Sequence, residues 1–549
     1  MRRWNGWGDT ATAMDLPEQG LAFLGERVGA GYPLPDAKLE AVKALVPPSR
    51  LQGIAEATGV DVMHDAESRI RHARGQSLAD WLAMRSGRFG AFPDAVAFPR
   101  SSADVRKLLV HCARHDIVVI PYGGGTSVAG HVNPVEGTSK PVLTVSLSRM
   151  NSLQDLDEES QIATFGAGVA GPHLEAQLRA KGFTLGHFPQ SFELSTLGGW
   201  VVTRSSGQQS LRYGRIEQLF AGGRVELMRG DGEALDIPAF PASAAGPDLR
   251  EWCLGSEGRM GILTEVKVRV TRLAEKETFL AFFLPNWTKA RDAARALVQS
   301  RTQLSMLRVS NAVETETQLA LAGHPGQIAW LERYLGWRGA AEGKCMMTLG
   351  VTGSRAQVSA VKQQLKHVLS DFGAVSTGEL LGRKWAEKRF MMPYLREALW
   401  QQGYVVDTLE TATNWRNVDR LLNAIEDNLR TTGPKTHVFT HLSHVYSQGC
   451  SIYTTYVFPC QASYDETLKT WAKLKHSTSR IIVEHGGTIS HQHGVGKDHA
   501  PYLPAEKGDV AMEAIGAVMK HFDPAGLLNP GTLLADAPGV PLPEQLAGD

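Results

Sequence analysis

Cysteine is scarce in this 549-residue chain, and the five cysteines are scattered, with no C-x-x-C pair among them. An odd number of isolated thiols gives no disulfide framework and no structural zinc motif, and it is typical of a reducing compartment. A net charge is also lacking, because 57 basic residues balance 57 acidic ones. This balance gives no indication of a nucleic acid as partner or of steering by bulk charge.

Long apolar runs are missing as well. No stretch approaches about 18 uninterrupted apolar residues, and residues 1–20 contain basic residues without the apolar run of a signal peptide. No S-K-L-type ending is present, and we expect a cytoplasmic protein. The length of 549 residues exceeds what one hydrophobic core usually supports, so at least two domains are expected.

Helical and strand periodicities alternate through the first half of the chain. Residues 95–100 and 117–122 are predicted as strands, residues 101–116 as the helix between them, and residues 123–130 as a glycine loop. Residues 255–274 form a glycine turn followed by a strand whose alternating valines share one face. This alternation predicts an α+β or α/β lobe that ends near residue 275, and the α+β class is the one we expect for the whole chain.

Two further amphipathic helices, at residues 286–301 and 354–373, each follow an apolar strand. They predict a second lobe with an antiparallel sheet backed by helices. A last helix is expected to end at Asp523 and Pro524. We therefore expect four parts, which are an N-terminal helical or extended segment (1–85), a first lobe (86–275), a second lobe (276–535) and a flexible tail (536–549).

Three glycine-rich stretches are the first sign of a ligand. Gly123, Gly124 and Gly125 allow positive φ and a close approach of the backbone, and their successive N–H groups suit a phosphate. The spacing is neither G-x-G-x-x-G nor G-x-x-x-x-G-K-[ST], so taken alone the loop is equally consistent with a tight turn. Residues 186–219 and 255–265 supply more glycines among hydroxyl, aromatic and apolar side chains, which favours a binding site.

The motifs "PYGGGTSV", "GHFPQSFELSTLGGWVVTRSSG", "GSEGRMGILTE" and "HFDPAGLLNPG" occur in this order. Together they resemble the flavoprotein superfamily of vanillyl-alcohol oxidase and p-cresol methylhydroxylase. Within it, the alkyldihydroxyacetonephosphate synthase (alkylglycerone-phosphate synthase) family is the most similar, from Arg3 to about Leu534. The resemblance implies an FAD-binding lobe of two subdomains at 86–275, and a substrate lobe of the FAD-linked oxidase C-terminal type at 276–535.

Carried over to this sequence, the resemblance implies three groups of FAD-binding residues. The glycine loop would cradle the pyrophosphate, the second stretch would line the ribityl chain and ring, and the third would lie near the adenine half. These groups are Pro121, Gly123, Gly124, Gly125, Thr126 and Ser127; Ser195, Thr196, Gly199, Thr203 and Ser206; and Glu257, Gly261 and Ile262. Thr126 stands where members with covalent FAD often have histidine, so non-covalent FAD is expected.

Metal-dependent members of the superfamily, such as D-lactate dehydrogenases, carry patterns like H-x-G-D-G-N-x-H and G-E-H-G-[IV]-G. This sequence keeps His444 but has Tyr453 where the last histidine of the first pattern would fall, and Gln492 where the second has glutamate. A phenol and an amide are poor ligands for a hard metal ion near neutral pH. We therefore predict no metal.

The synthase family instead has histidines before G-V-G and a tyrosine in the preceding strand, which this chain matches at His491, His493 and Tyr453, while Gln492 replaces the middle histidine. Tyr453 is expected to act as acid and base, and the two histidines as donors that stabilise charge. Arg396 is the expected cation for a phosphate or the active site, with Arg308 as a second candidate. The alternative for Arg396 is an ion pair with Glu397 or Glu410.

The function implied by the resemblance is the exchange of the acyl chain of acyl-dihydroxyacetone phosphate for a fatty alcohol, through a flavin N5 adduct and without net electron transfer. The alternative is an FAD-dependent oxidoreductase that oxidises a 2-hydroxyacid or an alcohol. A small lipid or hydroxyacid substrate, peripheral membrane contact and a homodimer are expected. Among the other histidines, at least one of His437, His441 and His444 is expected to be structural, and His499 to be a solvated loop residue.

Overall fold

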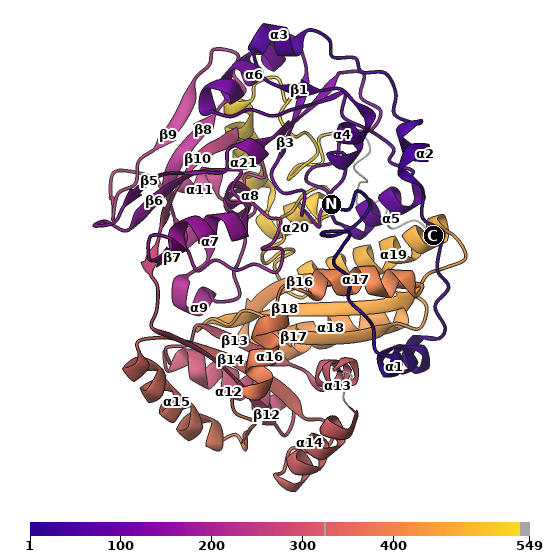
Figure 1. The fold of residues 1–549 in the computed structure, drawn as a ribbon, viewed down its shortest axis with the longest axis vertical. Coiled ribbons are helices and arrows are strands. Elements are labelled where there is room, and N and C mark those ends of the chain that lie inside the picture. The colour runs from indigo at the N-terminus through magenta and orange to yellow at the C-terminus, as the bar shows by residue number, and fades with distance from the viewer. Residues whose placement is uncertain (323–324, 538–549) are drawn as a thin grey trace.

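The computed structural model describes residues 1–322 and 325–537 as two lobes (Figure 1). The first lobe, in the upper part of Figure 1, contains a four-stranded and a five-stranded sheet. The second lobe, below it, contains one seven-stranded sheet. The predicted α+β class is confirmed, and so is an antiparallel sheet with helices in the second lobe.

The four-stranded sheet has the order β1-β2-β4-β3, with β2, β4 and β3 parallel and β1 antiparallel to β2. Its strands are β1 (Val62–Met63), β2 (Ala95–Ala97), β3 (Val118–Tyr122) and β4 (Val142–Ser146). Helix α6 (Ser102–Arg114) connects β2 to β3 and begins where the Ser101 side chain accepts a hydrogen bond from the Asp104 N–H. Its apolar residues recur at helical spacing and are buried, so the predicted strand, helix and strand are confirmed here.

The five-stranded sheet is antiparallel, with the order β5-β6-β10-β8-β9. Its strands, together with the small pair β7 and β11, are β5 (Leu153–Asp157), β6 (Ile162–Gly166), β7 (Phe183–Thr184), β8 (Phe220–Glu226), β9 (Ala234–Ile237), β10 (Ile262–Arg269) and β11 (Thr271–Arg272). Val266 and Val268 of β10 are fully buried in the first-lobe core, as their alternation predicts.

The seven-stranded sheet of the second lobe has the order β15-β12-β14-β13-β17-β18-β16. Its strands are β12 (Lys276–Leu284), β13 (Met306–Ser310), β14 (Cys345–Gly353), β15 (Val375–Ser376), β16 (Tyr404–Asn414), β17 (His437–Leu442) and β18 (Gly449–Pro459). Four amphipathic helices contribute to the same core, namely α12 (Trp287–Gln299), α15 (Arg355–Ser370), α18 (Val418–Thr431) and α19 (Tyr464–Glu484).

Further helices join the sheets or cover the lobes (Figure 1). In the N-terminal segment and the first lobe these are α1 (Glu18–Val28), α2 (Leu39–Lys43), α3 (Ile54–Thr58), α4 (Ala66–Arg71), α5 (Leu78–Ser86), α7 (Gly171–Arg179), α8 (Leu197–Val202), α9 (Ser210–Tyr213), α10 (Ile216–Leu219) and α11 (Arg250–Cys253). Later in the chain they are α13 (Ala312–Leu321), α14 (Pro325–Trp337), α16 (Leu380–Lys388), α17 (Met392–Gln401), α20 (Leu503–Lys507) and α21 (Asp509–Phe522).

The N-terminal segment packs on the second lobe, and the C-terminal segment returns to the first lobe. Trp7 and Trp81, from the N-terminal segment, are buried in the second-lobe core. After the second lobe the chain returns, so that Leu528 lies in the first-lobe core and forms an isolated parallel bridge with Val119 of β3. The sheets therefore divide near residue 275, whereas the cores share segments distant in sequence.

No helix within residues 1–322 and 325–537 combines the length and the apolar character needed to span a membrane. The tail expected at residues 536–549 lies, from residue 538 onward, outside the described residues.

Candidate active site

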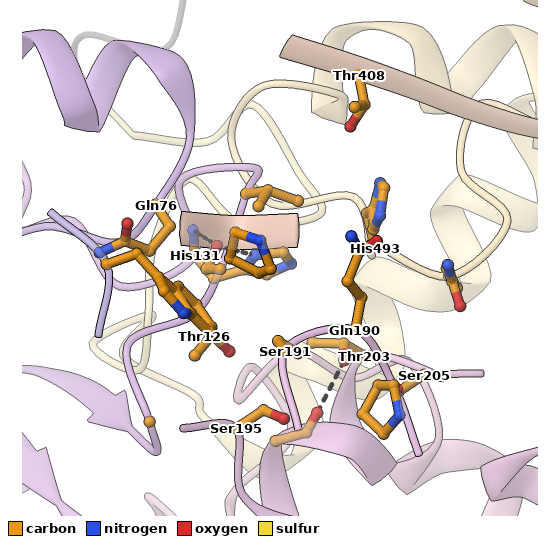
Figure 2. A pocket seen from close by; sticks show the side chains of 18 of the residues that line it. Gln76, Thr126, His131, Gln190, Ser191, Ser195, Thr203, Ser205, Thr408 and His493 are labelled. Carbon is orange, nitrogen blue, oxygen red and sulfur yellow. Dashed lines mark hydrogen bonds between the residues drawn. The ribbon is translucent and has the colours of Figure 1, made fainter. Parts of the chain in front are cut away.

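A single cavity is lined by residues of both lobes. Figure 2 shows Thr408 and His493, from the second half of the chain, facing Ser191, Ser195 and Thr203 of the first lobe across this space. The glycine loop that follows β3 forms another part of the wall. The cavity thus brings together the glycine-rich stretches and the predicted catalytic residues.

The glycine loop packs so tightly on the second glycine-rich stretch that side chains cannot be accommodated. A Cβ on Gly124 would lie 1.8 Å from the Leu194 carbonyl oxygen, and one on Gly123 would lie 2.4 Å from Thr196 Oγ1. Thr196 Oγ1 is itself buried and has no hydrogen-bond partner among the described residues. Bare backbone and an unsatisfied hydroxyl on a cavity wall suit the phosphates and ribityl chain of FAD.

All of the predicted FAD-binding residues except Ser206 line the cavity. The Ser206 hydroxyl instead lies 3.3 Å from Nδ1 of His444, and the neighbouring Ser205 faces the cavity in its place. Gln76, His131 and Asn529 also line the cavity, although the sequence did not single them out. His131 directly follows the glycine loop and Asn529 lies within the motif "HFDPAGLLNPG", whereas Gln76 comes from a segment without a motif.

Glu257 joins the third glycine-rich stretch to the turn at Gly494 to Gly496. Its carboxylate accepts hydrogen bonds from the backbone N–H groups of Val495 and of Gly496, the latter at 2.7 Å, and lies 3.1 Å from Nε2 of His131. Burial alone would lower the pKa of His131, but the Glu257 charge raises it. The Glu257 side chain therefore fixes a turn between the lobes in addition to lining the cavity.

Tyr453 extends from β18 into the cavity wall. Its hydroxyl donates to Thr408 Oγ1 at 3.3 Å, and its ring stacks on His441 with a centroid distance of 4.7 Å. The ring also meets His493 edge-on, with centroids 5.9 Å apart. Burial, and then the nearby charge of Glu410, raises the pKa of Tyr453, which therefore starts as a proton donor.

Arg396, on α17, is a half-buried cation to which the described part of the chain offers no carboxylate partner. One nitrogen donates to the Gln76 carbonyl at 2.7 Å, and the guanidinium lies 4.6 Å from the Trp81 ring centroid. Its Nε and Nη2 atoms are buried and have no hydrogen-bond partner among the described residues. Neither alternative ion pair is formed, because Glu397 pairs with Arg85 and Glu410 contacts Ser443, His491 and Gln492. Burial lowers the pKa of Arg396, yet guanidinium groups stay charged in proteins.

Arg308, the second candidate cation, also lines the cavity but is already paired. Its Nη2 donates to Glu314 at 2.6 Å. Burial raises the pKa of Glu314, but Arg308 and His441 together lower it to about 2. Of the two predicted cations, Arg396 is thus the better placed to receive an anion.

His491 does not line the cavity with His493. Residues 491–493 form a series of bends, and of the two histidines only His493 lines the cavity. Nδ1 of His491 lies 3.1 Å from Glu410, and its Nε2 receives hydrogen bonds from Tyr446, at 2.7 Å, and Arg215. Gln492, whose role the sequence did not assign, lines the cavity instead.

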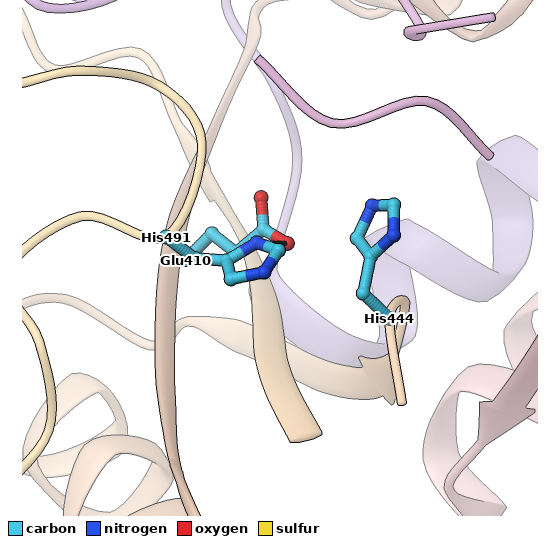
Figure 3. A group of neighbouring side chains, drawn as sticks. All are labelled: Glu410, His444 and His491. Atoms are coloured by element: carbon cyan, nitrogen blue, oxygen red, sulfur yellow. Dashed lines mark hydrogen bonds and ion pairs between the residues drawn. The ribbon is translucent and has the colours of Figure 1, made fainter. Parts of the chain in front are cut away.

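Glu410, His444 and His491 place three potential ligand atoms within 4.8 Å of one another (Figure 3). Such a group is able to hold a metal ion, but a guanidinium nitrogen of Arg215 lies 3.1 Å from Nε2 of His491. A permanent cation at that distance opposes a second one. We therefore interpret the three side chains as part of a hydrogen-bond network, and the absence of a bound metal stays a prediction.

His499 was wrongly predicted as a solvated loop residue. It lies in an irregular segment, but it is only 4 % exposed, and its Nδ1 lies 3.1 Å from the Gly494 carbonyl oxygen. The structure thus uses it to order the glycine turn.

Part of the second-lobe wall of the cavity is apolar, and we call it the apolar arm. It is formed by side chains from α1, α13, α17 and the strands β16 to β18, which are Leu24, Leu321, Leu395, Leu399, Val406, Phe439 and Val457. The sequence did not reveal this arm, because all of its members except Leu321 also belong to one small hydrophobic cluster, and a sequence pattern does not separate cavity wall from core. A long hydrocarbon chain is the guest that such a surface favours.

Comparisons with known proteins agree with this geometry. The family model described as the FAD binding domain matches residues 93–237, and the one described as the C-terminal domain of FAD linked oxidases matches residues 273–533. Alkyldihydroxyacetonephosphate synthase of Trypanosoma brucei brucei is 29 % identical, over 98 % of this chain and 93 % of its own.

Solved structures show the same relationship. A crystal structure of an alkyldihydroxyacetonephosphate synthase superimposes with a TM-score of 0.83 and 26 % identity, covering 96 % of this chain and 98 % of the other. p-Cresol methylhydroxylase, at 15 % identity and a TM-score of 0.67 over 89 % of this chain and 99 % of its own, shares the fold. With the glycine cradle, these findings identify the chain as an FAD-dependent enzyme of the alkyldihydroxyacetonephosphate synthase type.

Proposed function

We propose that this enzyme replaces the acyl chain of acyl-dihydroxyacetone phosphate with a fatty alcohol, releasing a fatty acid. One observation carries the proposal: a single cavity joins the glycine cradle, the unpaired guanidinium of Arg396 and the apolar arm. A phosphorylated ketone with a long chain needs both an anion-binding group and an apolar surface. The synthase name of the relatives that span nearly the whole chain supports the same substrate class.

Bound FAD supplies the reactive ring, held by the glycine loop, Thr196 and the other residues that line that end of the cavity. Arg396 binds the phosphate, and the apolar arm receives the hydrocarbon chain. Tyr453 and His493 exchange protons with the substrate: one accepts the proton from the carbon beside the carbonyl, and one protonates the departing carboxylate. The reaction exchanges one oxygen-bound chain for another and leaves the number of electrons unchanged.

The test uses the FAD-loaded enzyme under anaerobic conditions, with acyl-dihydroxyacetone phosphate and a long-chain alcohol. We expect an alkyl product and free fatty acid by mass spectrometry without an electron acceptor. Tyr453→Phe should lose turnover while keeping FAD, because the ring stays and only the hydroxyl is removed. Reduction of the flavin by a 2-hydroxyacid, with no alkyl product, would instead establish the oxidoreductase alternative.

The role of Arg396 has its own test. Arg396→Met should raise KM for the phosphorylated substrate by about a hundredfold or more, since a charged hydrogen-bonding group is lost from a buried site. Arg389→Met is the matched control, because Arg389 is also partly buried with an unpaired nitrogen but lies outside the cavity. Equal effects of the two substitutions on KM would contradict the assignment.

We also propose that FAD is bound without a covalent link. Residues 123–127 of the glycine loop include Thr126 but no histidine. The next histidine is His131, whose two ring nitrogens face Ser127 and Glu257. Acid precipitation should therefore release all of the flavin, and flavin that stays with the denatured chain would contradict this proposal.

Peripheral contact with a lipid surface is proposed through the outer face of α14. Trp330 and Trp337 are 65 % and 81 % exposed, and Trp330 stacks on Tyr334. Aromatic residues of this kind favour the membrane–water interface. Helix α14 also follows α13, whose residue Leu321 lines the apolar arm.

Vesicle co-sedimentation tests this contact. The double substitution Trp330→Ala and Trp337→Ala should reduce binding, whereas Phe240→Ala, which removes an exposed aromatic ring from the first lobe, should not. A homodimer and a cytoplasmic location are likewise proposals, tested by sedimentation and by cell fractionation. The five cysteines, all buried and free, are compatible with a reducing compartment.

A further inference from the structure

Glu410 is a fully covered carboxylate next to the cavity. It lies on β16, directly opposite Tyr453 in the sheet register, and its side chain is 0 % exposed. One carboxylate oxygen accepts a hydrogen bond from Ser443 at 2.7 Å and lies 3.1 Å from Nδ1 of His491. The other accepts from Nε2 of Gln492 at 2.6 Å and lies 3.7 Å from Nε2 of His493. Glu410 thus contacts all three residues that precede the glycine turn.

The direction of the hydrogen bonds at His491 follows from Arg215. A guanidinium can only donate, so Nε2 of His491, 3.1 Å from Nη1 of Arg215, must accept. The ring proton is therefore on Nδ1 and is donated to Glu410, as the arrangement in Figure 3 allows. This fixes His491 as a neutral imidazole and leaves one Glu410 oxygen for Gln492 and His493.

We propose that Glu410 is a positioning residue: its carboxylate holds Gln492 and His493 against the cavity opposite Tyr453 and favours the protonated form of His493. The inference rests on the proposed function only in assigning His493 to proton transfer. Residues 491–493 belong to no helix or strand that would fix their positions. The buried Glu410 carboxylate fixes them instead, through contacts with their side chains.

The charges around His493 support this role. Glu410 and Asp407, both on β16, favour its protonated form, whereas Lys475 of α19 opposes it. His491, being neutral, adds no net charge beside it. The phenol of Tyr453 on β18 is uncharged and meets the ring edge-on. Burial lowers the pKa of His493, and Glu410 is the main group that counters burial.

The experiment measures the protonation of His493 directly in the resting, FAD-loaded enzyme, without substrate. Histidine labelled with ¹³C at Cε1 is followed by NMR over pH, and His493→Gln assigns the signal. Glu410→Gln should move the His493 titration to lower pH by about one to three pH units, the usual effect of an opposite charge at this distance. His493→Gln should abolish one limb of the pH profile of kcat/KM. In Glu410→Gln the same limb should move to lower pH.

Glu426→Gln is the matched control. Glu426 is also buried in the second lobe and accepts hydrogen bonds from Asn311 and Thr440, but it lies outside the cavity, so the His493 titration should not move. An unchanged titration in Glu410→Gln, or an equal shift in the control, overturns the proposal. Because no substrate is present, this result is independent of whether the proposed reaction occurs.

A second variant and a wild-type measurement guard against misfolding of Glu410→Gln. Glu410→Asp keeps the charge but withdraws the carboxylate by one methylene, so kcat should fall more than tenfold while the His493 titration shifts less than in Glu410→Gln. In the wild-type enzyme, ¹⁵N shifts should show His491 with its proton on Nδ1. A proton on Nε2 would overturn the proposed direction of the network.

Discussion

Replacing Glu257 with glutamine tests how the two lobes are held together at the cavity. Each of the two backbone N–H groups bonded to its carboxylate has a charged acceptor, and a bond of this type contributes about 1.5–3 kcal/mol. In Glu257→Gln one oxygen still accepts, but the new NH₂ group faces a second donor. We therefore expect local opening of the turn to become easier by about 3 kcal/mol, or roughly a hundredfold.

Hydrogen exchange at Val495 and Gly496 is the assay, because these are the amides that Glu257 binds. Both should exchange about a hundred times faster in Glu257→Gln, while amides in the core of β17 keep their protection. Glu251→Gln serves as the control, since it removes a carboxylate that is 54 % exposed and paired with Arg204. Unchanged exchange at the two amides would refute the role of Glu257.

Three further outcomes follow from individual contacts. Gly124→Ala should lose FAD absorbance, because its Cβ would meet the Leu194 carbonyl, whereas Gly326→Ala, with open space around it, should retain it. Burial and Asp80 raise the pKa of Asp498 to about 7, so stability should fall as pH rises from about 4 to 7, and Asp498→Asn should remove this dependence in denaturant titrations. Gln492→Glu should be unstable above neutral pH, as measured by its Tm, because two carboxylates would meet 2.6 Å apart.

Local sequence patterns were sufficient to predict the main helices and strands and the glycine loop on the first-lobe side of the cavity. The burial of Val105, Leu108 and Cys112 on one face of α6 shows why helical spacing predicted that element. The glycine loop could be recognised because its function depends on consecutive residues. Tyr453, His493 and Arg396, predicted from motif resemblance, line one cavity as expected, although their catalytic roles remain predictions.

Contacts between distant segments could not be read from the sequence. Glu410 lies on β16, where a glutamate would usually be expected to face solvent, and its hydrogen-bond partners are more than 30 residues away. Arg215 reaches His491 from the other lobe, 276 residues earlier. The side that His491 faces could not be read from its motif for the same reason, since it is set by contacts with Arg215 and Tyr446.

The parallel bridge between Val119 and Leu528 has a consequence for the order of events during synthesis. The first-lobe core includes Phe522, Leu527 and Leu528, so a nascent chain cannot complete that core until these late residues have left the ribosome. Until then, β3, which precedes the glycine loop, pairs with β4 but lacks its bridge to Leu528. Stable FAD insertion should therefore follow release of the nearly complete chain, and a stalled chain that ends before residue 520 should remain colourless.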